Sequence, residues 1–294
     1  MKHIFIVNPV AGKGKALKFV GKIKSNVRSV TRDYAIRITR HPGHGTEIAQ
    51  EYAGLENLRL YSVGGDGTLN EIVNGIAESK TPLGIIPAGA GNDFARMLYS
   101  IKNLDIITRS LLTGIVKPID MVKVNSDYFV NVSSVGFDAD VAYNSNHLRK
   151  LLFVPGSFSY YLSIFTTLIK NKSHKLDIEI DGALKSSNYL LATVANGKYY
   201  GGGMIPAPAA VIDDGILDIC TVESKSRIEI LKLFSRYIKG KHATIPGVSF
   251  YKGNSIKISS AGPISLNLDG EVKRIKNVQY KIIPGGLNII CPDT

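Results

Sequence analysis

The chain has 294 residues, of which 44% are hydrophobic and 20% charged, and its formal net charge is +12. This composition excludes a disordered or low-complexity chain, and it is sufficient for one large core or two ordinary domains. The two cysteines, Cys220 and Cys291, lack the spacing of a metal site, and the opening MKHIFIVNPV is too short an apolar stretch for a signal peptide. We therefore expect a folded protein of the reducing cytoplasm.

The basic charge is concentrated near the N-terminus. Between Lys13 and Arg40 there are nine Lys or Arg residues and a single acid, Asp33. Such a balance favours a polyanionic partner, namely nucleic acid, an anionic membrane surface or a phosphorylated ligand, although a solvated helix face that only aids solubility is the alternative. No RNA-recognition, zinc-finger or basic-zipper pattern accompanies the charge, so we expect no nucleic-acid partner.

The first 120 residues alternate between strand and helix patterns. Strands are expected at HIFIVNP (3–9), YAIRITR (34–40), LRLYSVGGDG (58–67) and LGIIPAGAGND (83–93). Helices are expected at about Lys15–Val30, Thr46–Ala53, Leu69–Ala77 and Phe94–Leu98. Four strands that each enter a helix through a Gly-, Pro- or Asn-containing loop predict an α/β domain, with the loops gathered at the carboxyl edge of the sheet.

One stretch, Leu151–Ile169, has nearly the length of a membrane span. Its sequence is LLFVPGSFSYYLSIFTTLI, and Pro155 and Gly156 interrupt it. A helix that begins after Pro155 would have about 13 residues, too few to cross a bilayer. We predict an amphipathic core helix, and the alternative is a wall of a site for an apolar ligand.

After about Asp120 the pattern changes to short alternating strands. They are expected at LDIEIDG, YLLATVAN, GILDICTV, SIKISS, ISLNLDG, VQYKII and LNIIC, with turns at Asp181-Gly182 and Gly285-Gly286. These strands predict a second, β-sandwich-like domain over residues 121–279, after an α/β domain over residues 1–120 that the last strands, about 280–294, would complete.

A single amphipathic helix, about Arg227–Ile238, is expected between these strands. Ser226 would be its N-cap, and one apolar face is predicted from Ile228, Leu231, Phe234 and Ile238.

The strand–helix junction Gly64-Gly65-Asp66-Gly67-Thr68 carries the clearest chemical pattern. Glycines let the backbone approach a bulky ligand, and a helix that begins at Leu69 would point its free N–H groups toward it. That combination suits phosphate, and an aspartate beside phosphate implies a cation such as Mg²⁺. The alternative is a tight structural turn in which Asp66 caps the helix.

Two further junctions have the same character. NPVAGKGKA (Asn8–Ala16) carries Lys13 but is not a Walker A loop, and PAGAGNDFA (Pro87–Ala95) places Asn92 and Asp93 at a helix start. Each of these loops is ordinary by itself. Three of them at one sheet edge predict a phosphate-binding site.

The motifs NPVAGKGK, SVGGDGTLNEIVNGI and PLGIIPAGAGNDFAR, in this order and spacing, resemble the diacylglycerol kinase catalytic-domain family, which includes soluble bacterial lipid kinases and sphingosine kinases. The resemblance continues through VNVSSVGFDADV (130–141), VANGKYYGGGMIPAPAAVIDDGILDI (194–219) and LNLDGE (266–271), and so covers nearly the whole chain. GGDGT alone also occurs in NAD kinases, whereas the later motifs make the resemblance specific.

The resemblance implies an α/β nucleotide-binding domain, a β-sandwich-like domain and an active site in the cleft between them. The implied activity is transfer of the ATP γ-phosphate to a lipid hydroxyl with Mg²⁺. The residues that would form the ATP site are Asn8, Pro9, Val10, Ala11, Gly12, Thr39, Gly64, Gly65, Asp66, Gly67, Thr68, Leu69, Asn70, Gly89, Ala90, Asn92 and Asp93. Ala90-Gly91 stands where many relatives carry Thr or Ser, so one hydroxyl contact would be absent.

The resemblance also implies a proton acceptor in LNLDGE. It is Asp269 or Glu271, and one of them could bind Mg²⁺ while the other acts as the base; the alternative is a solvent-exposed Asp-Gly turn. Asp120, in KPIDM at the domain junction, is a further candidate anchor for the metal or the lipid head group.

VIDDGI (211–216) resembles a structural Mg²⁺ site of the family. Asp214 would supply a side-chain oxygen there, and Val211 and Ile216 would supply backbone carbonyls. Some relatives have a second acidic ligand at the position of Val211. The alternative is a plain hairpin turn at Asp213-Asp214-Gly215.

These observations favour a cytoplasmic, ATP- and Mg²⁺-dependent lipid kinase that binds an anionic membrane transiently, without spanning it. The alternatives are a kinase of a small soluble substrate such as NAD, and a non-catalytic nucleotide or lipid sensor. The acceptor lipid is not identified by the sequence, and exposed strand edges would permit a homodimer. His41 and His44 are interpreted as polar loop residues, because the histidines form no H-x-x-x-H or H-E-x-x-H pair.

Overall fold

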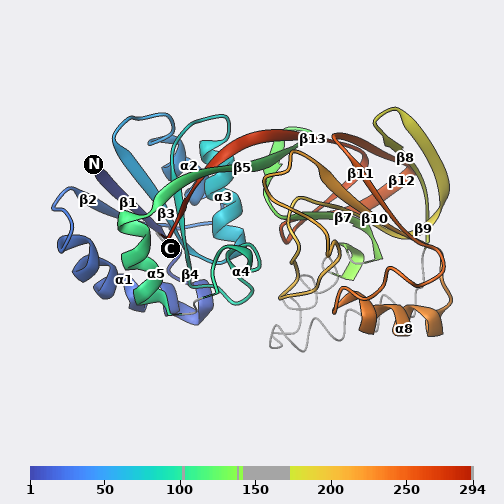
Figure 1. Ribbon diagram of the computed structural model, residues 1–294, viewed down its shortest axis with the longest axis horizontal. Coiled ribbons are helices and arrows are strands. Elements are labelled where there is room, and N and C mark those ends of the chain that lie inside the picture. Colours follow the sequence, from blue (N-terminus) through green and yellow to red (C-terminus); the bar gives the residue numbers. More distant parts are fainter. Residues whose placement is uncertain (101–102, 138, 142–172, 293–294) are drawn as a thin grey trace.

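The protein consists of two lobes joined by long strands (Figure 1). The structure is a computed structural model, and it describes residues 1–100, 103–137, 139–141 and 173–292. The predicted helix within Leu151–Ile169 therefore lies outside the described residues. Within the described ranges, no helix is long and apolar enough to cross a bilayer.

The N-terminal lobe is built on a parallel sheet. The four predicted strands are present as β1 (Lys2–Val7), β3 (Leu58–Gly64), β4 (Leu83–Pro87) and β2 (Tyr34–Ile38), in the spatial order β4-β3-β1-β2. β1 and β3 are buried along almost their whole length because helices cover both faces of the sheet.

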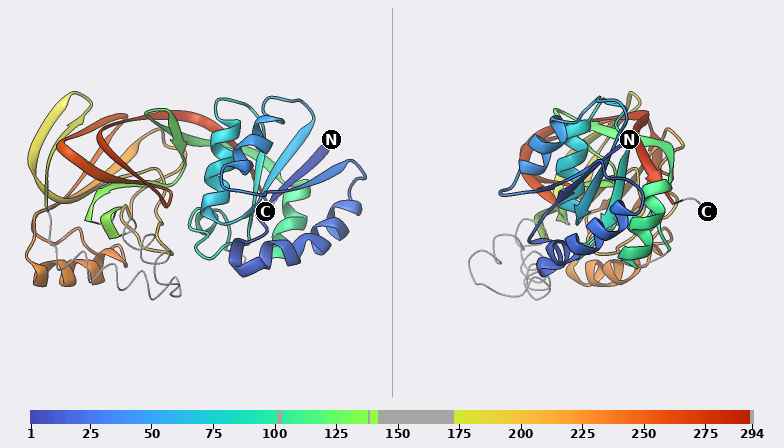
Figure 2. Two further views of the ribbon diagram at one scale, coloured as in Figure 1. Left: turned by 180° about the vertical axis from the view of Figure 1, so that it is seen from behind. Right: turned by 90° about the vertical axis from the view of Figure 1, so that its left-hand side faces the viewer.

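Five helices of the described residues belong to this lobe: α1 (Ala11–Arg28), α2 (His44–Gln50), α3 (Asp66–Ile76), α4 (Ala95–Leu98) and α5 (Leu104–Thr113). α1 and α5 cover one face of the sheet, and α2 and α3 cover the other (Figure 2, right). α5 was not predicted, although Asn103 is a typical N-cap whose side chain accepts the N–H groups of Asp105 and Ile106.

Helix α3 begins earlier than the sequence pattern predicts. Its first residue is Asp66 rather than Leu69, and Gly65 precedes it in extended conformation. The GDGT segment is therefore the first helical turn, where an acidic residue is favoured by the helix dipole. In α1, by contrast, Gly12, Lys13 and Gly14 have positive φ, so the regular helix starts at Lys15, as predicted.

The C-terminal lobe is β-sandwich-like, as expected from its alternating strands. Its strands, with the connecting β5, are β5 (Ile115–Val124), β6 (Asp127–Phe129), β7 (Val132–Gly136), β8 (His174–Ile180), β9 (Ala183–Ala195), β10 (Leu217–Glu223), β11 (Val248–Gly253), β12 (Ser255–Leu268) and β13 (Glu271–Cys291). A buried apolar core that includes Phe129, Ile178, Val194 and Tyr280 fills the sandwich.

Two pairs of predicted strands are in fact single long strands. SIKISS and ISLNLDG are both parts of β12, whose pairing with β13 shifts register between Ser259 and Ile264. VQYKII and LNIIC are both parts of β13. The predicted turn at Gly285-Gly286 is wrong, because these glycines form a bulge in β13.

β13 passes through both lobes. Its first part pairs with β12, from Glu271 to Lys281, and its later part pairs with β5 up to Cys291. At Ile289 it also joins the parallel sheet beside β4. A single 13-stranded sheet therefore connects the described parts of both lobes.

Helix α8 (Arg227–Tyr237) lies against the end of the sandwich, with the expected Ser226 N-cap closed by a capping box with Glu229. The predicted apolar face is right only for Phe234, which packs against the core. Ile230, Leu233 and Tyr237 are buried, whereas Ile228 and Leu231 are 69% and 56% exposed. The helix carries two apolar stripes, and only the tertiary contacts select the one that is buried.

Asp120, on β5, is buried and fastens three chain segments together. Its Oδ2 accepts the N–H of Gly215 at 2.7 Å, and its Oδ1 accepts the N–H of Gly285, in the β13 bulge, at 2.9 Å. Its own N–H donates to Ile212. With both carboxylate oxygens bonded to the backbone, Asp120 is placed to stabilise the junction of the two lobes.

We predict that Asp120→Ala lowers the free energy of unfolding by about 2 kcal/mol or more, since two backbone donors lose their acceptor. Asp120→Asn, which keeps one acceptor oxygen, should lose less. Urea unfolding followed by circular dichroism measures both values. Asp127→Ala, which breaks only the exposed ion pair with Lys273, is the control, with an expected loss below about 0.5 kcal/mol. An equal effect of Asp120→Ala and Asp127→Ala would contradict this role.

Candidate active site

Three loops at the carboxyl ends of β1, β3 and β4 meet backbone to backbone. Gly12 has φ +58°, and a Cβ at this position would lie 2.2 Å from the carbonyl oxygen of Ala88. A Cβ on Gly89 would lie 2.3 Å from the Cα of Gly65. Glycine is therefore required where these loops approach one another.

Side chains fasten the same loops. Asn8 Nδ2 donates to Thr68 Oγ1 at 3.0 Å, which joins the first loop to the first turn of α3. Asn92, with φ +54°, closes its own loop, because its amide both accepts from the N–H of Gly89 and donates to the carbonyl of Gly89, each at 2.9 Å. These bonds preorganise the backbone around the N-terminus of α3.

The loops surround a cavity of about 630 Å³, here called the loop cavity. Its lining residues are Asn8, Pro9, Val10, Ala11, Gly12, Thr39, Arg40, His41, Pro42, Gly65, Gly67, Thr68, Glu71, Gly89, Ala90 and Glu271. Eleven of the seventeen residues predicted for the ATP site are among them. Four lining residues were not predicted: Arg40, His41 and Pro42 belong to no glycine motif, and Glu71 follows the glycines of GGDGTLNE.

A second cavity of about 310 Å³ lies between the lobes and is here called the carboxylate cavity. Its lining residues are Asp66, Gly67, Leu69, Gly91, Asp93, Phe94, Asn131, Tyr200, Gly201, Gly202, Met204, Asn267, Asp269, Gly270 and Glu271. Two residues, Gly67 and Glu271, line both cavities. The two cavities therefore adjoin at the Glu271 carboxylate.

Asp66 and Asp93 belong to one hydrogen-bonded unit of the N-terminal lobe. Asp66 Oδ1 accepts the N–H of Asp93 at 2.7 Å. Asp93 Oδ2 accepts the N–H of Gly202, from the other lobe, at 2.7 Å, whereas its Oδ1 is buried without a hydrogen bond in the described part of the chain. The pKa of Asp93 is raised to about 6, mainly by burial and also by the nearby charge of Asp66, against the lowering effects of the Gly202 N–H and Arg96.

Asp269 occupies the tight turn between β12 and β13, with φ +46°. Its two carboxylate oxygens accept the N–H groups of Val130 at 3.2 Å and Val132 at 2.9 Å. Burial raises the pKa of Asp269 to about 7, and the charge of Asp66 adds to this effect. Glu271, two residues later, is exposed and begins β13. Asp269 therefore anchors the turn, and Glu271 extends to the border of the cavities.

The carboxylate cavity has the donors that a hard divalent cation requires. Asp66, Asp93 and Asp269 converge there, and one buried oxygen of Asp93 lacks a hydrogen-bond donor. The pKa values of Asp93 and Asp269 are raised mainly by burial, and the neighbouring charge of Asp66 adds to the effect. These residues fit a Mg²⁺ ion.

The remaining predicted residues lie outside both cavities. Gly64 ends β3, Asn92 closes its loop, and Asn70 donates to the carbonyl of Tyr128 at 3.4 Å. Asp120 is at the lobe junction described above, away from both cavities, so the structure does not bring it to a metal or a lipid head group.

The predicted metal turn, Val211, Asp214 and Ile216, is also separate from the cavities and does not fit a resident Mg²⁺. Asp214 Oδ1 accepts the N–H of Ile216 at 3.1 Å, while Lys252 Nζ lies 3.5 Å from Asp214 Oδ2 and 3.6 Å from Asp218 Oδ2. Lys252 is fixed there by the β10–β11 register, which pairs it with Asp218. The lysine thus already supplies a positive charge to this acidic turn.

Comparison with known proteins agrees with this geometry. Residues 2–124 match the diacylglycerol kinase catalytic domain, and residues 131–291 match the YegS C-terminal NAD kinase beta sandwich-like domain. A diacylglycerol kinase of Bacillus subtilis (strain 168) is 30% identical over 291 residues, which cover 98% of this chain and 95% of the relative. One of Staphylococcus aureus (strain bovine RF122 / ET3-1) is 32% identical over 269 residues, 90% of this chain and 84% of the relative.

The fold is also shared with a solved structure. The crystal structure of a diacylglycerol kinase from Bacillus anthracis str. Sterne aligns with a TM-score of 0.76 at 26% identity, covering 99% of this chain and 96% of that one. The family model and the names of these relatives support a kinase. The chain belongs to the diacylglycerol kinase catalytic-domain family, whose members named here are lipid kinases.

We predict that the ligand-free protein does not depend on a divalent cation at the Asp214 turn. The change in its melting temperature between EDTA and Mg²⁺ should agree within about 1 °C with that of Asp214→Asn, because Mg²⁺ bound in the carboxylate cavity would stabilise both proteins equally. Lys252→Met, which leaves Asp214 and Asp218 without a cation, should melt lower in EDTA and gain about 2 °C or more with Mg²⁺.

The matched control is Lys257→Met, which removes another cross-strand lysine whose partner is Glu179 alone. It should acquire no response to Mg²⁺. A Mg²⁺-dependent rise in the melting temperature of the wild-type protein that is smaller in Asp214→Asn would show that the turn holds a metal.

Proposed function

We propose that this chain transfers the γ-phosphate of ATP, with Mg²⁺, to the hydroxyl of diacylglycerol or a closely related lipid. The observation that carries the proposal is the position of Glu271, whose carboxylate borders both the loop cavity and the carboxylate cavity. Phosphoryl transfer needs a donor site and an acceptor site that adjoin, with a proton acceptor between them.

The residues have distinct roles in this proposal. The backbone of the three loops and the first turn of α3 bind the phosphates of ATP. Glu271 accepts the proton of the lipid hydroxyl, and Asp269 positions the turn through its bonds to Val130 and Val132. Asp66 and Asp93, with Asp269 nearby, would hold Mg²⁺, which neutralises charge on the phosphates when bound.

A lipid acceptor is favoured over a soluble one by an apolar slot beside the carboxylate cavity. The slot is narrow and is lined by Phe137, Val141, Leu190, Leu191, Tyr200, Met204, Ile230, Leu233, Phe234 and Tyr237. Tyr200 and Met204 line the carboxylate cavity as well, so the apolar cluster lies next to that cavity. The slot has a volume of only about 20 Å³, too small for an acyl chain, so it offers a lipid an apolar wall beside the acceptor site, which suits a lipid better than a dinucleotide such as NAD.

The outer face of α8 supports docking to an anionic membrane. Ile228 and Leu231 are exposed on it, and the exposed cations Arg227, Lys232 and Lys239 lie on or next to the same helix. Apolar side chains flanked by cations bind reversibly at the interface of an anionic bilayer. In this proposal the lipid substrate is reached at the membrane surface.

The reaction is tested with γ-labelled ATP, Mg²⁺ and mixed micelles that contain diacylglycerol. Glu271→Gln should lower kcat about 10²- to 10⁴-fold, because the variant lacks the proton acceptor but keeps its shape. Glu179→Gln, an exposed substitution on β8, is the control and should retain full activity. Asp269→Asn should impair activity as well, through the turn that carries Glu271.

Two results would contradict the proposal. If the protein forms labelled NADP in a parallel reaction with NAD and forms no labelled lipid, the soluble-substrate kinase is favoured. Tight ATP binding without transfer to lipid or to NAD would favour the sensor.

Membrane docking is tested by co-sedimentation with vesicles that contain phosphatidylglycerol. Ile228→Ser combined with Leu231→Ser should weaken binding about 10-fold or more, since two apolar side chains no longer insert. Binding of the unaltered protein should also fall as salt rises. If vesicle binding changes neither with salt nor with the double substitution, the docking surface lies elsewhere on the protein.

A further inference from the structure

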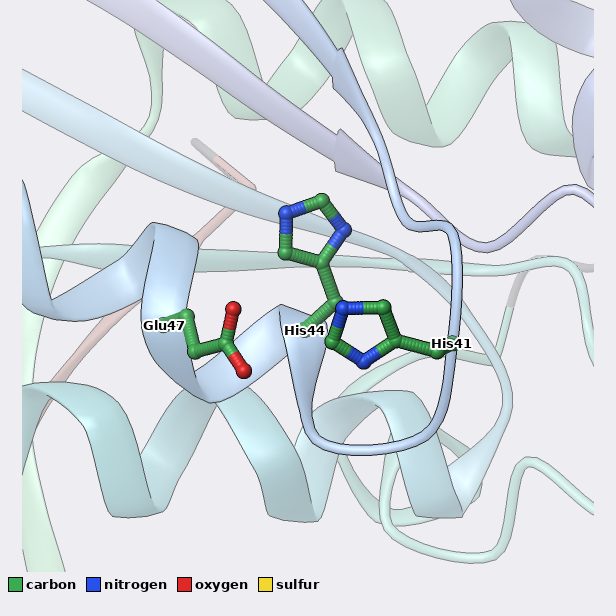
Figure 3. A group of neighbouring side chains, drawn as sticks. All are labelled: His41, His44 and Glu47. Atoms are coloured by element: carbon green, nitrogen blue, oxygen red, sulfur yellow. The ribbon is translucent and has the colours of Figure 1, made fainter.

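Two histidines form an aromatic pair beside the loop cavity. The rings of His41 and His44 are stacked, with centroids 4.8 Å apart and planes inclined by 20° (Figure 3). His41 belongs to the loop after β2, and His44 is the first residue of α2. Among the described residues that line the loop cavity, His41 has the one aromatic side chain. The pair, here called the histidine stack, thus reaches this cavity through His41.

The histidine stack is held in place by the backbone of its own loop. His44 Nδ1 accepts the N–H of Arg40 at 3.0 Å. His41 Nδ1 lies 3.0 Å from the carbonyl oxygen of Pro42, and the carbonyl can only accept, so this nitrogen carries the proton. Both rings therefore have a defined orientation before any ligand binds.

The loop is also tied to α3, the helix whose first turn lies at the glycine loops. Glu71 Oε1 accepts the N–H of Gly43, and Glu71 Oε2 accepts the N–H of Gly45, each at 2.8 Å. A Cβ on Gly45 would lie 2.5 Å from Glu71 Oε2, so the fit requires glycine. The position of the stack relative to the phosphate-binding loops is thus fixed by a helix side chain.

A metal site is the other use that such a cluster suggests, because Glu47 lies nearby and the candidate ligand atoms of the three side chains are within 4.8 Å of one another (Figure 3). The ring geometry opposes it. Imidazole lone pairs lie in the ring plane, so two nearly parallel rings do not aim them at one point. The Nδ1 atoms of both rings are, in addition, already hydrogen-bonded.

The direction of a nucleotide in the loop cavity follows from the two ends of that cavity. Glu271 and Gly67 border the carboxylate cavity, so the phosphate that is transferred has to lie beside them. The remaining phosphates follow the glycine loops and the N-terminus of α3. The base then extends toward the segment Thr39–Pro42, which contains the histidine stack.

We propose that His41 stacks on the purine base of ATP and that His44 supports it from behind. The inference rests on the proposed function, in that the ligand of the loop cavity is ATP. The stack supplies the base-dependent part of the affinity, and the glycine loops supply the part that depends on the phosphates. Stacking needs only an aromatic face, so an aromatic ring of similar size should replace His41.

The test compares ATP with inorganic tripolyphosphate, both with Mg²⁺, by isothermal titration calorimetry. His41→Ala should raise the Kd for ATP about 3- to 10-fold, the usual range for loss of an aromatic pair, and leave the Kd for tripolyphosphate unchanged. His41→Phe should restore the affinity for ATP. In the lipid kinase assay, His41→Ala should raise the KM for ATP and leave kcat unchanged.

Glu47→Ala is the matched control, because Glu47 belongs to the cluster but does not line the loop cavity. It should bind ATP normally. The proposal would be overturned if His41→Ala weakened the binding of ATP and of tripolyphosphate equally, or left the affinity for ATP unchanged. It would also be overturned if His41→Phe failed to restore the affinity for ATP. So would tight Zn²⁺ binding that is lost in both His41→Ala and Glu47→Ala.

The same measurements separate this inference from the proposed function. Base-dependent binding of ATP without transfer to any lipid would overturn the kinase proposal and leave the stacking intact. If the protein phosphorylates a lipid but His41→Ala does not change the KM for ATP, the kinase proposal stands and the stacking proposal is overturned.

Discussion

The pairing of β13 with both lobes is the constraint on which the site depends. Its first part is bonded to β12 and its later part to β5, so one hydrogen-bonded ribbon passes from the sandwich into the parallel sheet. Glu271 is the first residue of this strand, and its carboxylate faces loops that belong to the other lobe. A ribbon resists bending more than a single connecting chain does, and Asp120 fastens it further at the bulge of Gly285. The sheet that joins the two lobes therefore holds the two cavities next to each other.

Two acidic clusters among the described residues differ in where their positive charge comes from. At the Asp214 turn, the strand register brings Lys252 beside Asp214 and Asp218, and the protein supplies its own cation. In the carboxylate cavity the nearest cation to Asp93 is Arg96, 3.8 Å away, and the pKa values of Asp93 and Asp269 stay raised. Arg96 compensates the charge of these carboxylates only in part, and carboxylates beside a phosphate-binding loop favour an external cation, as phosphoryl transfer requires.

Much of the site could be predicted because its recognition elements are local. Gly12, Gly65 and Gly89 are needed where backbones touch, and Asp66 sits in a first helical turn, so short motifs reveal them. Glu271 was named only as one of two carboxylates. The structure separates them, because Asp269 has both oxygens bonded to backbone N–H groups and Glu271 reaches the border of the cavities. His41 was interpreted as a polar loop residue, since stacking on His44 and exposure to a cavity have no signature in the spacing of residues.

By itself, the sequence determined the alternation of strands and helices, the glycine loops, the Ser226 cap and the family to which the chain belongs, because each depends on neighbouring residues or on motif order. Tertiary structure alone decided which stripe of α8 is buried, that Gly285-Gly286 form a bulge instead of a turn, and that Asp120 binds backbone rather than ligand. These outcomes depend on the partner that each segment meets across the sheet or the core. Segments far apart in the chain provide those partners, and a local sequence pattern does not show which distant segment a residue will contact.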